Sequence, residues 1–136
     1  MGTDLVVIER IGQVMERFPE RFPARVFTEA ELNQCAGRQA GRIACLAKRF
    51  AAKEAFAKAL GSGMRDGLWF NQMEVGNDAL GRPVMRVSGE SARALERLRL
   101  IHQAREVAIH LSLADDGGFA LAYVVLESVG VVDMPG

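Results

Sequence analysis

RFAAKEAFAKALG, at residues 49–61, is the second half of the longest helix that the sequence predicts. No proline or glycine interrupts residues 42–60, alanine is frequent, and Gly61 stands where a helix would stop. We therefore predict a helix over residues 39–60 and take it as the strongest helix in the chain.

One stripe of this predicted helix is apolar, with a carboxylate in its middle. At 100° per residue, the stripe is made of Ile43, Leu46, Ala47, Phe50, Ala57 and Gly61. An ionised Glu54 in that stripe is costly unless a partner neutralises it, and Lys58, one turn further on, could be that partner. Two structural interpretations remain open: an ion pair at the edge of the stripe, or a helix that is buried through Ala52 and Phe56 instead.

A second carboxylate, Asp4, also lies where an apolar surface is expected. Residues 3–9 predict a strand, and its alternation puts Asp4 on the face of Val6 and Ile8. The simpler interpretation is an aspartate at a strand end that faces water. Together, two carboxylates from different elements match the way proteins hold Mg²⁺, which takes one or two carboxylates plus waters and phosphate oxygens. Lys58 would then neutralise further phosphate charge.

The third candidate for chemistry is His110, on a strand predicted over residues 105–114. Alternation puts His110 and Ser112 on one face, and the opposite face is apolar, with Ile109, Leu111 and Leu113. A histidine on a polar face near a turn could bond a phosphate or assist a proton transfer. An exposed strand histidine without a function is an equally good interpretation.

The remaining elements follow from caps, periodicity and turn residues. They are a helix over 10–18, a bent connection over 19–26, a helix from Thr28 to about Cys35, strands over 72–77 and 83–87, a helix over 89–99, and strands over 105–114 and 118–128. Thr28 and Glu31 fit a capping box, residues 61–63 a flexible turn, and the tail after Ser128 should fray. This order indicates an α+β fold rather than a doubly wound sheet.

Length and composition indicate one globular domain over residues 1–136. The 17 basic side chains balance the 17 acidic ones, so we expect neither nucleic acid nor a membrane surface as a partner. No apolar run is long enough for a transmembrane helix, and the N-terminus lacks a secretory signal. We therefore expect a cytoplasmic protein, in which Cys35 and Cys45 are free buried thiols rather than a disulfide.

Five segments, in order along the chain, carry one family resemblance. Residues 2–11 resemble an opening GxDxxxxxRI, residues 27–32 resemble FTxxE, and residues 49–61 resemble RFAAKEAxxKAxG, which is the most specific of the five. Residues 81–83 resemble a G-x-P turn, and residues 110–113 resemble an HxSxS/T strand. The chain is thereby similar to the holo-acyl-carrier-protein synthases, a subfamily of small 4′-phosphopantetheinyl transferases.

This resemblance implies a fold, an assembly and a reaction. The fold would be that of the phosphopantetheinyl transferases, an antiparallel sheet packed against a long helix, assembled as a homotrimer with sites between subunits. The enzyme would move the 4′-phosphopantetheine group of coenzyme A to a serine of apo acyl carrier protein and release 3′,5′-ADP. It would require Mg²⁺ and serve fatty acid biosynthesis.

The resemblance also assigns roles to residues. Asp4 and Glu54 would hold the metal, and Lys58 would contact the transferring phosphate. The coenzyme site would comprise Asp4, Arg49, Lys53, Glu54, Lys58, Gly61, Pro83 and His110. The groups expected to act in catalysis are Glu54, Lys58 and His110, and the serine proton could pass to Glu54, to His110 or to a water on the metal.

Carrier proteins are acidic, so their docking surface should be basic. The resemblance places that surface on and just after the first helix, where we expect Arg10, Arg21 and Arg25 to contact carrier carboxylates. Glutamates are interleaved there, so a merely solvated face is the alternative. For the whole chain, two other functions stay open: a non-catalytic module that binds coenzyme A or a carrier protein, and a structural trimer subunit with an incidental carboxylate pair.

Overall fold

The computed structural model describes residues 1–61 and 69–132. Its elements are β1 (Gly2–Val7), α1 (Ile8–Arg17), α2 (Arg21–Val26), α3 (Glu29–Ala36), η1 (Gln39–Gly41), α4 (Arg42–Leu60), η3 (Phe70–Gln72), β2 (Met73–Asn77), β3 (Pro83–Val87), α5 (Gly89–Ile101), β4 (Ala104–Asp116) and β5 (Phe119–Val131). Helices and antiparallel sheets occur together, which confirms the predicted α+β class. Within the described residues, no helix is long and apolar enough to cross a membrane.

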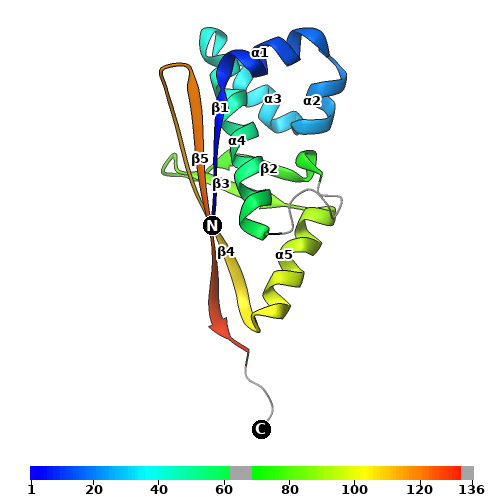
Figure 1. Ribbon diagram of the computed structural model, residues 1–136, viewed down its shortest axis with the longest axis vertical. Coiled ribbons are helices and arrows are strands. Elements are labelled where there is room, and N and C mark those ends of the chain that lie inside the picture. Colours follow the sequence, from blue (N-terminus) through cyan, green and yellow to red (C-terminus); the bar gives the residue numbers. More distant parts are fainter. Residues whose placement is uncertain (62–68, 133–136) are drawn as a thin grey trace.

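The larger sheet has three antiparallel strands in the order β1-β5-β4 (Figure 1). β4 and β5 form one long hairpin, in which Ala104 still pairs with Val131 at the open end. α4 lies along one face of this sheet, above Ala120, Ala122 and Val124 of β5, which are fully buried. The small alanine side chains let the helix lie close to the strand.

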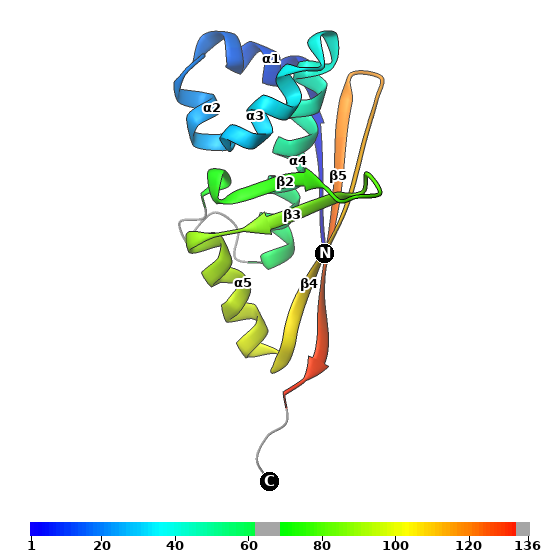
Figure 2. The same cartoon turned by 180° about the vertical axis from the view of Figure 1, so that it is seen from behind.

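The other sides of α4 are covered as well. Seen from behind, the β2–β3 hairpin crosses α4, while α1, α2 and α3 lie near one end of the helix and α5 lies towards the other (Figure 2). Ala52 and Phe56 are therefore as fully buried as Leu46 and Ala47. Most of the predicted stripe is buried, and so is the alternative face through Ala52 and Phe56, because α4 is a central helix that other elements cover on most of its sides. Glu54 remains half-buried.

Several local predictions are confirmed. The Thr28 amide donates to the Glu31 carboxylate over 2.9 Å, and the Glu31 amide donates to the Thr28 hydroxyl over 3.2 Å, so the capping box opens α3. α4 ends at Gly61, which adopts a left-handed φ of 81°. From Ser62 onward, the turn predicted at residues 61–63 lies outside the described residues. The two predicted strand pairs are also present.

Several predicted boundaries were wrong, among them the start of the long helix, which is Arg42 because residues 39–41 form the separate short turn η1. The N-terminal strand ends at Val7, and Ile8 already belongs to α1. Residues 21–26 form the helix α2 rather than a bent connection, because Pro23 stands in its first turn, where no amide donor is needed. β5 continues to Val131 instead of fraying after Ser128, because β4 pairs with it along its whole length.

The expectation of free thiols was also wrong, because Cys35 and Cys45 form a disulfide. Cys35 lies near the end of α3 and Cys45 near the start of α4, and the short connection between these helices brings their Cα atoms within 5.6 Å. Both residues are buried. The spacing of ten residues carries no disulfide signature, so only the helix packing brings the two sulfurs together.

Reduction of this disulfide should destabilise the protein. A cross-link over a loop of this size lowers the entropy of the unfolded chain, and it stabilises the fold by about 2–3 kcal/mol. We expect the melting temperature in dithiothreitol to fall below that of the oxidised protein. The matched control is the double variant Cys35→Ala/Cys45→Ala, whose melting temperature should not respond to the reductant. Equal melting temperatures with and without reductant in the unmodified protein would show that the cross-link contributes no stability.

Candidate functional site

The structure brings the two predicted carboxylates and Lys58 together where β1 lies against α4. The Lys58 ammonium is 2.9 Å from an Asp4 carboxylate oxygen and donates to the Thr3 carbonyl over 3.2 Å. The lysine side chain is about half exposed, whereas the Asp4 side chain is mostly covered. The predicted partner of Glu54 is thus bound to Asp4, and all three charged groups belong to one cluster.

Glu54 is the electrostatically strained member of this cluster. Burial raises the pKa of its carboxyl group, the negative charge of Asp4 raises it further, and Lys58 opposes both effects. Two carboxylates therefore lie close enough to repel each other. A cation between them would relieve that repulsion, which is the property expected of a metal-binding pair.

The approach of β1 to α4 depends on a glycine. A Cβ atom added to Gly2 would lie 2.2 Å from the Ala55 carbonyl oxygen and 2.7 Å from the Ala59 backbone nitrogen. Because both atoms belong to the α4 backbone, they cannot move aside as a flexible side chain would. Gly2 thus allows the close contact between β1 and α4. Asp4, two residues further along β1, is thereby placed beside Lys58 of α4. The GxD pattern contained this residue, but the sequence could not show what it touches.

A groove of about 460 Å³ opens beside the two carboxylates of this cluster, Asp4 and Glu54. Asp4, Glu54 and Arg10 provide its charged lining, and Phe22 and Phe50 are among its apolar walls. The two aromatic rings lie 6.3 Å apart, so α2 and α4 contact each other at the groove. The groove therefore joins the carboxylate pair to the region of α1 and α2 that carries the predicted docking arginines.

The chemistry of this donor set suits Mg²⁺. Within residues 1–61 and 69–132, no group of three or more His, Cys, Asp or Glu side chains could hold a metal ion. Mg²⁺ does not require such a group, because it keeps several waters and binds one or two carboxylates together with substrate phosphates. Asp4 and Glu54 supply that number of carboxylates, and Lys58 adds a cation for phosphate oxygens.

Lys53 and Arg49 do not join this cluster. Lys53 has no exposed surface and pairs with Glu31 over 2.5 Å. Arg49 is 4% exposed, and its guanidinium donates to Cys45 and to Gln34. In the structure, neither cationic head lies on a surface that a coenzyme can reach. The lysine–glutamate pair went unnoticed in the sequence, although both residues lie within the quoted motifs.

His110 lies on another face of the molecule. It is exposed on β4, with Ser112 on the same face and Ile109 and Leu111 turned inward, as the alternation predicted. Its Nε2 atom is 3.1 Å from a Glu127 carboxylate oxygen. Within one chain, His110 therefore does not meet Asp4 and Glu54. Its expected coenzyme contact stays a prediction, as do those of Gly61, at the end of α4, and Pro83, at the start of β3.

The three predicted docking arginines are exposed on α1 and α2. Arg10 lines the groove beside Asp4 and Glu54. Arg21 stacks on the Phe18 ring, with its guanidinium carbon 4.8 Å from the ring centroid. The three arginines thus share the exposed surface of α1 and α2 with Glu9, Glu16 and Glu20, and only Arg10 lies beside the carboxylate pair.

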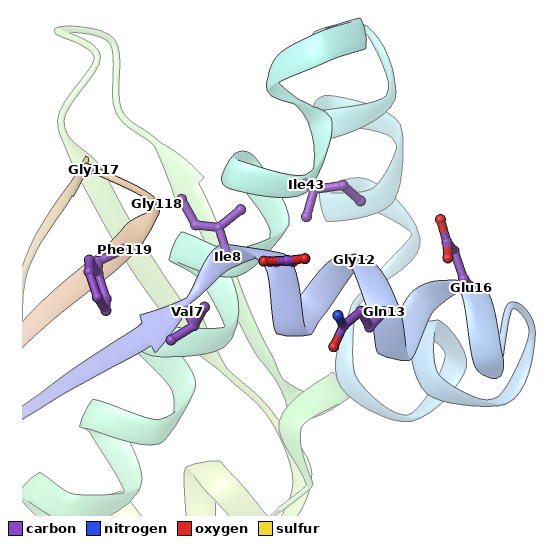
Figure 3. A pocket seen from close by; sticks show the side chains of 10 residues that line it. Val7, Ile8, Gly12, Gln13, Glu16, Ile43, Gly117, Gly118 and Phe119 are labelled. Carbon is purple, nitrogen blue, oxygen red and sulfur yellow. The ribbon is translucent and has the colours of Figure 1, made fainter.

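A larger groove, of about 760 Å³, lies on the other side of α1 (Figure 3). Its walls are mostly apolar, with Ile8, Ile43 and Phe119, and its charged lining residues are Glu9 and Glu16. Among the described residues that line this groove there is no lysine or arginine, so it does not suit a phosphate-bearing substrate.

Comparisons with known proteins agree on one family. A family profile described as the 4′-phosphopantetheinyl transferase superfamily matches residues 1–124. A holo-[acyl-carrier-protein] synthase of Methylorubrum populi is 45% identical over 131 residues, which cover 96% of this chain and 94% of the relative.

Solved structures agree as well. The holo-[acyl-carrier-protein] synthase of Neisseria meningitidis is 39% identical, with a TM-score of 0.73 and coverage of 93% of this chain and 95% of that one. The Helicobacter pylori enzyme, solved in complex with coenzyme A, is 28% identical, with a TM-score of 0.76 and coverage of 93% and 98%.

Proposed function

Because the chain belongs to the holo-[acyl-carrier-protein] synthases of the 4′-phosphopantetheinyl transferase superfamily, we propose that its Asp4–Glu54–Lys58 cluster is the reaction site. The enzyme transfers the 4′-phosphopantetheine group of coenzyme A to a serine of apo acyl carrier protein. The meeting of two mutually repelling carboxylates with a lysine beside an open groove is the observation that carries the proposal.

Each residue of the cluster has a proposed task. Asp4 and Glu54 would hold Mg²⁺, and the bound ion would supply positive charge for the pyrophosphate of coenzyme A. Lys58 leaves Asp4 to contact the transferring phosphate. The Lys58 side chain is about half exposed, so water can solvate its ammonium group while it changes partners. The serine hydroxyl needs positioning and charge neutralisation more than covalent help, because phosphoryl transfer demands little else of the protein.

We propose a homotrimer in which His110 of one subunit faces the site of a neighbour. The sheet face turned away from α4 supports this, because several large apolar side chains on it are exposed in the part of the chain that the structure describes. Its exposed large side chains include Leu5, Phe119, Leu121 and Tyr123. A surface of this kind marks a contact with another molecule. Sedimentation should give a mass three times that of one chain, and a monomeric mass would refute the assembly.

The transfer itself is tested by intact mass. Apo acyl carrier protein is incubated with the enzyme, coenzyme A and Mg²⁺, and a parallel sample contains EDTA. We expect the carrier to gain one phosphopantetheine group, and we expect EDTA to prevent the gain. Coenzyme A binding without any gain in carrier mass would favour the non-catalytic binding module instead. Absence of Mg²⁺-dependent coenzyme binding would favour a structural subunit.

The surface of α1 and α2 that carries Arg10, Arg21 and Arg25 is proposed as the carrier docking face. Reversing charge at Arg21 and Arg25 together should raise the KM for carrier protein about tenfold or more, because acidic carrier groups would meet like charge. The KM for coenzyme A should stay within about twofold. Arg97→Glu, on the exposed side of α5, is the matched control. An unchanged KM for carrier protein in the double reversal would remove these arginines from the docking face.

We further propose that the enzyme works in the cytoplasm and serves fatty acid biosynthesis; the Cys35–Cys45 disulfide is then an exception among proteins of a reducing compartment. Fatty acid synthesis uses acyl carrier protein in its holo form, which supports this role. Deleting the coding sequence should let apo carrier protein accumulate in cells. An unchanged holo fraction would place the activity in another process.

A further inference from the structure

Lys53 and Glu31 form an ion pair that the proposed reaction does not use. Both side chains have no exposed surface, and the Lys53 Nζ atom is 2.5 Å from the Glu31 Oε1 atom. The same ammonium donates to the Val26 carbonyl over 2.6 Å and lies 5.3 Å from the centroid of the Phe27 ring. A buried charge is costly unless its partners are complete, so this pair is held by a specific arrangement of several segments.

Those segments are the ones that surround the proposed docking surface. Val26 is the last residue of α2, and its carbonyl is tied to α4 through Lys53. Glu31 accepts from the Thr28 amide in the α2–α3 junction and, through its second oxygen, from the Val75 amide of β2. The pair therefore joins the end of α2, the start of α3 and β2 to one point on α4.

The position of α2 matters for the groove and for the arginines. α2 has only six residues, and it carries Arg21, Arg25 and the groove-lining Phe22. A helix this short is held mainly by its ends and by its buried side chains. Lys53 directly precedes Glu54 on α4, so the contact with Val26 relates α2 to the carboxylate cluster through a single rigid helix.

We propose that Lys53 is a positioning residue for carrier-protein recognition: held by Glu31, it fixes the C-terminal end of α2, and with it Arg21 and Arg25, relative to Glu54. The inference rests on the proposed function, because it needs α2 to be a docking element. The family resemblance implied that Lys53 contacts coenzyme A. In this proposal Lys53 instead affects the affinity for the carrier protein.

Lys53→Met tests the proposal, because methionine keeps a straight buried chain and removes the ammonium. We expect the KM for carrier protein to rise about tenfold, while kcat and the KM for coenzyme A stay within about twofold. The second measurement is the Kd for a carrier protein whose acceptor serine is alanine, which should rise by the same factor. Lys48→Met is the matched control, since that lysine of α4 pairs with Asp115 rather than with α2.

Lys53→Met leaves Glu31 buried without its cation, so a second variant keeps the test valid if the single variant does not fold. Glu31→Gln/Lys53→Met removes both charges and retains an amide oxygen for the Val75 amide. We expect its melting temperature to recover towards wild type while the Kd for the carrier remains raised, because the Val26 carbonyl still lacks its lysine.

Two results would overturn the proposal. A raised KM for coenzyme A with unchanged carrier affinity would restore the direct coenzyme contact. Full recovery of carrier affinity in the folded double variant would make the pair a purely structural one. The Kd measurement needs no turnover, so it gives a result even if the wild-type enzyme fails the mass assay, and the two failures can be told apart.

Discussion

Glu54→Gln is expected to lose about a hundredfold or more in turnover while remaining folded. The amide keeps the shape of the side chain and removes one of the two negative charges proposed to hold Mg²⁺. Removing one preorganised hydrogen-bond donor from an oxyanion hole costs about 10²–10³-fold in turnover, on the order of 3–4 kcal/mol, and we expect a lost metal ligand to cost a similar amount. The carboxylate is half-buried and repelled by Asp4, so its removal opens no cavity and leaves no buried charge without a partner.

The same variant can be tested without an activity assay, through the pH dependence of its folding stability. Burial and the charge of Asp4 raise the pKa of the Glu54 carboxyl group. The folded protein therefore keeps the Glu54 proton at a pH where the unfolded chain has released it. In the wild type without Mg²⁺, the resulting stability is present below the ordinary carboxyl pKa and is lost as pH rises through the raised one. Urea unfolding between pH 4 and pH 8 should show this loss in the wild type and not in Glu54→Gln.

Whereas a rise in pH should lower the stability of the folded wild type, binding of Mg²⁺ should raise it. A cation held between the carboxylates stabilises only the folded state, so it should raise the melting temperature of the wild type. The increase should be much smaller in Glu54→Gln. Glu96→Gln, at an exposed ion pair on α5, is the matched control and should behave like wild type in all three assays. Wild-type turnover and a wild-type response to Mg²⁺ in Glu54→Gln would remove Glu54 from the site.

Gly2→Ala should have the second largest effect, although the substitution adds only a methyl group. The new Cβ would lie 2.2 Å from the Ala55 carbonyl oxygen, which belongs to the α4 backbone, so β1 must move away from the helix. Asp4 moves with its strand and leaves the position in which it meets Lys58. A displacement of about 1 Å in a reacting constellation can cost about 10²-fold in rate, and we expect a loss of that size in kcat.

Gly76→Ala is the matched control for this prediction. Gly76 also lies in a strand, and a Cβ added there meets no atom within 4 Å. Its turnover should stay within about twofold of wild type, and its melting temperature should change little. A Gly2→Ala enzyme with wild-type kcat would show that β1 can leave α4 without disturbing the carboxylate cluster.

Elements with local causes could be predicted from the sequence. The capping box at Thr28 and Glu31 needs only two residues at the right spacing, and the end of the long helix needs a residue that tolerates left-handed backbone at Gly61. The inward and outward faces around His110 follow from the two-residue period of a strand. Their causes lie within a few residues of each element, so no tertiary information is required.

The same distinction between local and long-range causes applies to the candidate site and to the residues that pack near it. The unusual positions of Asp4 and Glu54 were visible because charged residues interrupt apolar patterns, and a family motif covers each of them. The disulfide between Cys35 and Cys45 was mispredicted, because its partners meet only through the packing of α3 on α4. The burial of Lys53 was missed for the same kind of reason, since its partners Glu31 and Val26 lie more than twenty residues away.

The sequence by itself determined the helical and strand periods, the caps and the identity of the charged groups, because these depend on residue type and short spacing. The tertiary structure decided which faces of α4 are buried, which lysine meets a carboxylate in the groove and which one holds the end of α2. Lys53 and Lys58 lie on one helix within five residues of each other, yet one has no exposed surface and the other is half exposed. That difference arises from where β1, α2 and β2 pack around the helix, and long-range packing of this kind is a property of the folded chain as a whole.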